Sequence, residues 1–139
     1  MRLTATEVGF FQDYEDEEIL EVGVSGIDEA GVQRSFSIQR STYEPDEQEV
    51  QSGMDSYAVS NEQGFTVYGC LRRVHISGSL LTLTFTAEDA NILEIPTAVE
   101  VDLHDPGVDI PNLSTKLSDI LKWGAPEKRP ELIGLNASE

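Results

Sequence analysis

Residues 35–86 read SFSIQRSTYEPDEQEVQSGMDSYAVSNEQGFTVYGCLRRVHISGSLLTLTFT, and this stretch decides the fold. It contains three runs rich in β-branched and aromatic residues, which the turn sequences NEQG and GS separate. Such runs between turn signals are typical of β-strands. We therefore expect strands over residues 56–60, 65–77 and 80–86, following one another as an antiparallel meander.

The turn at residues 78–79 defines the register of the last two strands. Glycine at the first central position of a two-residue loop suits a type II′ turn, which pairs Ser77 with Leu80. Counting outward from this pair places Arg72 opposite Phe85, on the face that carries the apolar side chains. Because an unpaired charge is costly to bury, Arg72 needs either a carboxylate partner or a position at the sheet edge.

The remaining strands and helices follow from periodicity. Alternating apolar residues predict further strands over residues 3–11, 19–24, 33–40 and 98–103. Thr86 can cap a short helix over residues 87–93, and leucines at helical spacing predict a C-terminal helix over residues 111–123. The sequence thus predicts an α+β fold: a mostly antiparallel, meander-type β-sheet with both helices packed on it. We expect one domain over residues 1–125 and a polar C-terminal tail over residues 126–139.

The chain is strongly acidic. Its 139 residues include 26 aspartates and glutamates but only 9 lysines and arginines, which gives a net charge of −17. Residues 1–62 hold 15 of the acidic residues and 3 of the basic ones. Such a charge repels phosphate backbones and anionic membranes, so we expect no binding to nucleic acid or membranes, and it favours a basic protein partner. The alternative is that the acidic surface serves solubility alone.

The sequence also bears on the cellular compartment. No apolar run reaches the ~18 residues that span a bilayer, and residues 1–10 lack the basic and apolar regions of a signal peptide. The single cysteine, Cys70, cannot form an intramolecular disulfide, as is usual in a reducing compartment. We therefore expect a cytoplasmic protein in which Cys70 is a small buried side chain.

Catalytic chemistry has little support in the sequence. The two histidines, His75 on a predicted strand and His104 at a predicted turn, belong to no recognisable catalytic or zinc-binding spacing. Nucleotide-binding glycine motifs, a GxSxG motif and a CxxC pair do not occur. The acidic run at residues 46–49 lacks the spacing and the internal glycine of a calcium loop. We expect no catalytic residue, no cofactor and no metal site.

Residues 41–54 are predicted to connect two strands as a long acidic loop. Pro45 interrupts any helical pattern in this stretch. Connections of this length are commonly functional. Tyr43 and Tyr57 flank the acidic residues, and tyrosines beside carboxylates can anchor a protein interface. The alternative for these tyrosines is a half-buried position on a strand.

Four motifs follow one another in the central region of the chain. They are FSIQR at residues 36–40, GMDSY at 53–57, YG at 68–69, and LTL at 81–83 with the predicted helix that follows to Ala90. In order and spacing they resemble the immunity protein 10 family of bacterial polymorphic-toxin systems, over residues 33–123. The chain departs from the family pattern at Ser56, Ala58 and Cys70, where threonine, cysteine and glycine are usual.

The resemblance implies a small cytoplasmic protein that protects a cell by stoichiometric binding of a toxin, without catalysis or a cofactor. Because toxins that attack nucleic acid are commonly basic, we expect the acidic loop to face the toxin. Its predicted contact residues are Tyr43, Glu44, Asp46, Glu47, Glu49, Asp55 and Tyr57. Two other classes stay open: an acidic structural or adaptor subunit, which could form a homodimer, and a small-molecule binder or enzyme with a pocket between sheet and helix.

Overall fold

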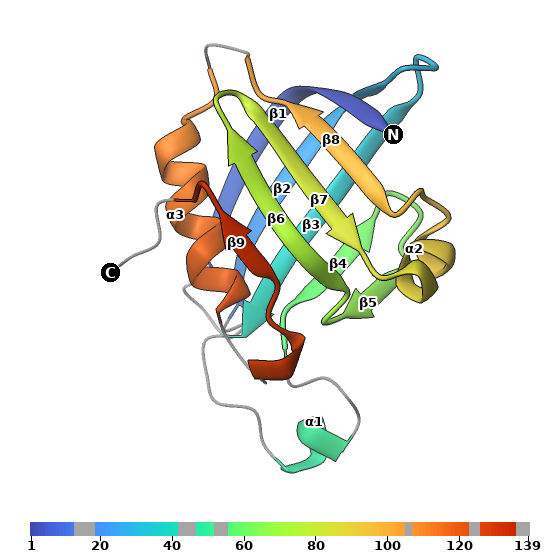
Figure 1. Ribbon diagram of the computed structural model, residues 1–139, viewed down its shortest axis with the longest axis vertical. Coiled ribbons are helices and arrows are strands. Elements are labelled where there is room, and N and C mark those ends of the chain that lie inside the picture. Colours follow the sequence, from blue (N-terminus) through green and yellow to red (C-terminus); the bar gives the residue numbers. More distant parts are fainter. Residues whose placement is uncertain (13–18, 42–46, 52–55, 105–106, 123–125, 136–139) are drawn as a thin grey trace.

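A nine-stranded sheet is the framework of the computed structural model, which describes residues 1–12, 19–41, 47–51, 56–104, 107–122 and 126–135 (Figure 1). The strands are β1 (Arg2–Gln12), β2 (Ile19–Asp28), β3 (Gln33–Ser41), β4 (Ala58–Asn61), β5 (Thr66–Tyr68), β6 (Leu71–Ser77), β7 (Leu80–Phe85), β8 (Ala98–Asp102) and β9 (Glu131–Ile133). The helices of the described residues are α1 (Glu47–Gln51), α2 (Ala87–Leu93), α3 (Ile110–Leu121) and a 3-10 turn over Pro126–Lys128.

The strands lie in the order β5-β4-β3-β2-β1-β8-β7-β6-β9. All neighbours are antiparallel except the pairs β1–β8 and β6–β9. The α+β class and the mostly antiparallel sheet are thereby confirmed. A simple meander is wrong, because the single strand predicted over residues 65–77 is two strands, β5 and β6, near opposite edges of the sheet. Gly69, with φ 61°, takes the backbone out of the extended conformation between them.

The sheet curls so that its two ends approach each other (Figure 1). Phe36 on β3 and Phe85 on β7 have ring centroids 6.4 Å apart, although three strands separate β3 from β7 in the sheet order. Apolar side chains from both halves of the sheet fill the space between them. The largest fully buried ones include Leu3, Ile38, Tyr57, Leu81 and Phe85. The core therefore lies inside the curl.

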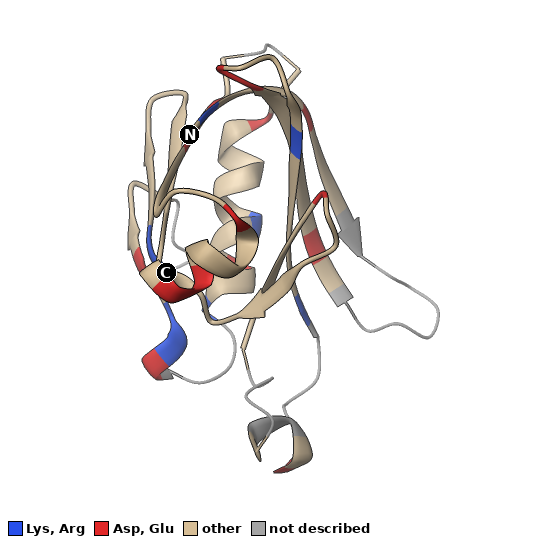
Figure 2. Ribbon diagram, turned by 90° about the vertical axis from the view of Figure 1, so that its right-hand side faces the viewer, with Lys and Arg blue, Asp and Glu red and all other residues tan. Residues whose placement is uncertain are grey.

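Both helices predicted from the sequence are present. α2 covers the predicted residues 87–93, and the hydroxyl oxygen of Thr86 accepts the amide of Asp89 at its N-terminus, as a capping residue does. α3 contacts β2 and β3 and is seen between the two halves of the sheet in Figure 2. Its predicted apolar stripe is buried and consists of Leu113, Leu117, Ile120 and Leu121. The helix thus packs on the sheet as expected.

A β-bulge corrects the predicted register of the hairpin β6–β7. The two-residue turn pairs Ser77 with Leu80, as predicted. Further along the ladder the register shifts, so that Leu71, and not Arg72, lies opposite Phe85. The bulge adds one residue to β6 and turns Arg72 to solvent. This arrangement avoids the cost of a charge on the apolar face.

Part of the segment predicted as a polar tail belongs to the sheet. β9 pairs in parallel with β6, and Arg73 lies beside Glu131 in this pairing. Residues 131–133 of the predicted polar tail are therefore an edge strand of the sheet. β9 has only three residues and lies between Pro130 and Gly134. Because proline and glycine also mark loops, the sequence does not distinguish this short strand from a loop.

Asp28 organises the turn between β2 and β3. Its Oδ1 accepts the amides of Ala30 and Val32, each at 2.9 Å, and its Oδ2 accepts from Arg34 Nε at 3.1 Å. These hydrogen bonds lower the pKa of Asp28, and the Val32 amide is the largest cause. Arg34 also lies 3.6 Å from Glu62 in the turn between β4 and β5. Through Arg34, Asp28 thus connects the β2–β3 hairpin to the β4–β5 hairpin.

Replacing Asp28 with asparagine should lower the free energy of unfolding at neutral pH, because an amide nitrogen cannot accept from Arg34. A carboxyl group whose pKa is lowered by folding stabilises the protein above its unfolded pKa. This stabilisation is lost as the pH falls through the lowered pKa. Urea midpoints of both proteins at a series of pH values should therefore converge on acidification. A difference that is constant or grows as the pH falls would contradict this role of Asp28.

Candidate interaction surface

The connection between β3 and β4 carries α1 away from the sheet (Figure 1). Glu47, Gln48 and Gln51 of this helix are exposed. The prediction of a loop without a helix over residues 41–54 is corrected here. A helix of five residues makes little more than one turn, which is too short to produce a recognisable period in the sequence.

An ion pair holds the start of this connection. Arg40, near the end of β3, has its Nη2 3.2 Å from Oδ1 of Asp119 on α3. The Arg40 side chain is 14% exposed, so solvent screens this pair less than a pair between two free surface side chains. The strand from which the connection leaves the sheet is therefore joined to helix α3.

Tyr57 holds the point where the connection returns to the sheet. Its side chain is 0% exposed, and its hydroxyl oxygen accepts the amide of Leu71 at 2.9 Å. The carbonyl oxygens of Leu71 and Lys128, at 3.2 and 3.0 Å, are positioned to accept its proton. Burial raises the pKa of this hydroxyl, which stays neutral and able to donate. Tyr57 thus links β4 to β6 and to the segment that leads into β9.

The structure places some of the predicted contact residues. Glu47 is exposed on α1, and Glu49 belongs to the same helix. The burial of Tyr57 contradicts its predicted contact with a partner, because no part of its side chain reaches the surface. Four other predicted residues lie outside the described ranges: Tyr43, Glu44, Asp46 and Asp55. The described part of the candidate surface is therefore α1, which lies between Arg40 and Tyr57 in the sequence.

The histidines and the cysteine lie elsewhere. His75 is half-buried on β6, and the exposed His104 has its Nδ1 2.6 Å from Oδ1 of Asp102, a contact that lowers the pKa of Asp102. Cys70 is buried, as predicted, and burial raises the pKa of its thiol, which disfavours the reactive thiolate.

Among the described residues, no three His, Cys, Asp or Glu side chains are arranged to hold a metal ion. In the same residues, no helix has the length and apolar character needed to cross a membrane.

A basic surface that no sequence pattern indicates lies near Tyr57. We call it the basic patch; it consists of Arg72 and Arg73 on β6 together with Lys128 and Arg129 before β9. The doublets Arg72-Arg73 and Lys128-Arg129 are visible in the sequence, but residues 74–127 lie between them. Only the pairing of β6 with β9, and the contact of Tyr57 with Lys128, bring the two doublets together.

Replacing Tyr57 with phenylalanine should destabilise the protein while leaving the ring in the core. The buried amide of Leu71 loses its acceptor, and an unsatisfied buried group typically costs about 1–3 kcal/mol. Chemical denaturation measures the change. Tyr68→Phe is the matched control, because Tyr68 lies on the edge strand β5 and is 39% exposed. Equal stability of the two variants would contradict the structural role of the Tyr57 hydroxyl.

The chain was compared with protein-family models, curated proteins and solved structures. The model of the family described as Immunity protein 10 matches residues 4–110. No curated protein and no solved structure gave a significant match. The matched range begins before the resemblance over residues 33–123 and ends at the start of α3, and it covers most of the 139 residues. The chain therefore belongs to the immunity protein 10 family.

Proposed function

We propose that this immunity protein binds a cognate toxin in the cytoplasm and neutralises it by stoichiometric contact, without catalysis or a cofactor. Family membership supports the class of function. The net charge of −17 supports a basic toxin as the partner and disfavours nucleic acid and anionic membranes. The toxin is neutralised because the bound protein covers or distorts the surface that it uses for its reaction.

The observation that carries this proposal is an acidic connection held at both ends on the surface of a member of an immunity family. Arg40 and Tyr57 hold the two ends, and Glu47 is exposed between them. A segment with fixed ends loses less conformational entropy on binding than a free one, so more of its contact energy appears as affinity. The proposed toxin-facing residues are Tyr43, Glu44, Asp46, Glu47, Glu49 and Asp55.

Charge explains how such a complex would form quickly. A field of one sign raises the association rate with a partner of the opposite sign, and salt screens this effect. An inhibitor that must act before a toxin damages the cell benefits from a fast association step. The acidic residues of the connection add to this field, and Glu47, which is exposed, is one of the proposed contact residues.

Replacing Glu44, Asp46, Glu47 and Glu49 with serine should weaken toxin binding by about tenfold or more at low salt, because charge pairs across an interface are lost. The dependence of affinity on salt should also become flatter. The partner for this measurement is the product of the adjacent reading frame, co-expressed and co-purified with the chain. Affinity is then measured at low and at high salt.

The matched control removes the same charge from elsewhere on the surface, by changing Glu7, Glu88, Glu94 and Glu100 to glutamine. Both variants carry a net charge of −13, because each change removes one negative charge from −17. Only the loop variant should lose the short-range contacts. Equal binding of the loop variant and the unmodified chain at low salt would remove the connection from the interface. An unmodified chain that neither binds this product nor protects cells from it would refute the function.

A further inference from the structure

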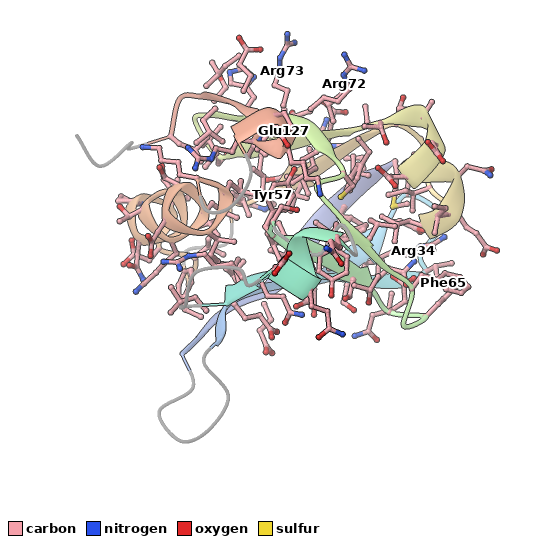
Figure 3. All side chains as sticks on the ribbon, turned by 90° about the horizontal axis from the view of Figure 1, so that it is seen from below. Arg34, Tyr57, Phe65, Arg72, Arg73 and Glu127 are labelled. Atoms are coloured by element: carbon pink, nitrogen blue, oxygen red, sulfur yellow. The ribbon has the colours of Figure 1, made fainter. Side chains whose placement is uncertain are left out.

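The basic patch gathers four of the nine lysines and arginines of an acidic protein. Arg72, Arg73 and Arg129 are exposed, and Lys128 is half-buried. Figure 3 shows Arg72 and Arg73 projecting from the same side of the molecule. The second doublet lies between Glu127 and Glu131, so this surface carries four positive and two negative side chains in a strongly acidic protein.

The β-bulge in β6 is the reason that two arginines share one face. In a regular strand, consecutive side chains point to opposite faces, so one of the two would face the core. The register shift between Leu71 and Arg73 gives β6 an extra residue, and both arginines are exposed. Bulges commonly redirect a side chain in this way. The bulge therefore leaves the guanidinium groups of Arg72 and Arg73 both exposed to solvent.

The patch adjoins the acidic connection. The carbonyl of Lys128 accepts the Tyr57 hydroxyl at 3.0 Å. The aliphatic part of Lys128 packs against Gly69, where an added Cβ would lie 3.0 Å from it. Figure 3 looks onto this end of the molecule and shows Tyr57 in the region between α1 and the two arginines. Because Tyr57 is also where the connection rejoins the sheet, one partner protein can contact both surfaces.

The chain's own carboxylates bind Arg72 and Arg73 only weakly or not at all. Arg73 Nε donates to Glu131 Oε1 at 2.8 Å, but both side chains are more than half exposed, and exposed ion pairs contribute little. Among the described residues, no carboxylate lies within ion-pair distance of Arg72. A guanidinium can bind a carboxylate through two parallel hydrogen bonds, so Arg72 is suited to an acidic group of a partner.

We infer that the basic patch is a second contact surface for the same toxin, and that it binds an acidic patch on that toxin. This inference rests on the proposed function. A uniformly basic toxin would be attracted by the net charge of −17 but repelled where it met Arg72 and Arg73. Contact at this end of the molecule therefore requires carboxylates opposite the arginines. The patch then sets the orientation of the complex and rejects basic proteins that lack the matching acidic patch.

The double variant R72E/R73E tests this inference because it should change the affinity in opposite directions in the two cases, contact at the basic patch and contact elsewhere. It makes the protein more acidic, which strengthens attraction to any basic protein whose contact lies elsewhere. Opposite an acidic patch it creates repulsion, so affinity for the co-purified toxin should fall by about tenfold or more, mainly through faster dissociation. Association and dissociation rates are measured by surface-based binding kinetics, and circular dichroism checks that the variant is folded.

The matched control is R2E/K116E, which changes two exposed residues on β1 and α3. Each change lowers the net charge by two, so both double variants carry −21. The neutral variant R72Q/R73Q removes the attraction without adding repulsion near Glu131 and should weaken binding by a smaller factor. If both acidic variants bind as tightly as each other, or more tightly than the unmodified chain, the inference is wrong and the proposed function stands. If the unmodified chain does not bind the toxin, both are wrong.

Discussion

The hydroxyl of Tyr57 is the contact on which the arrangement of the other elements depends. In the sheet order, β4 is second from one edge and β6 is second from the other, yet Tyr57, directly before β4, bonds to the backbone of Leu71 in β6. The same oxygen bonds to Lys128, which leads into β9. A buried phenol must satisfy its donor and its acceptor capacity, and here backbone groups from two distant segments do so. The two ends of the curled sheet meet at this side chain.

Local signals were sufficient for much of the fold. The helix α2 was predicted from one capping threonine, the turn of the β6–β7 hairpin from one glycine, and α3 from the period of its leucines. Each of these signals acts within about one turn of helix or one hairpin, so the sequence alone carries it. The order of the strands and the short β9 depend on pairing between distant segments, and no local pattern encodes that pairing.

The register error at Arg72 shows how tertiary energetics override a local pattern. Strict alternation would bury this guanidinium, and the cost of a buried unpaired charge exceeds the cost of a bulge. The candidate surface shows the same limit. Sequence composition identified the acidic connection, but it could not distinguish a tyrosine that faces a partner from one that closes the core. Tyr57 proved to be of the second kind. The basic patch was also beyond the sequence, because its two doublets meet only through the sheet and Tyr57.

Net charge and local charge act over different distances, so arginines in the proposed interface are compatible with a strongly acidic protein. At physiological salt the field of a protein decays over about 8 Å, so an approaching toxin responds first to the total of −17. At contact, only the side chains that meet determine whether the complex persists. A protein that relied on total charge alone would bind every basic protein in the cell with similar strength. In the proposed complex, Arg72 and Arg73 change that outcome, because they make the favourable orientation depend on a matching pattern in the partner.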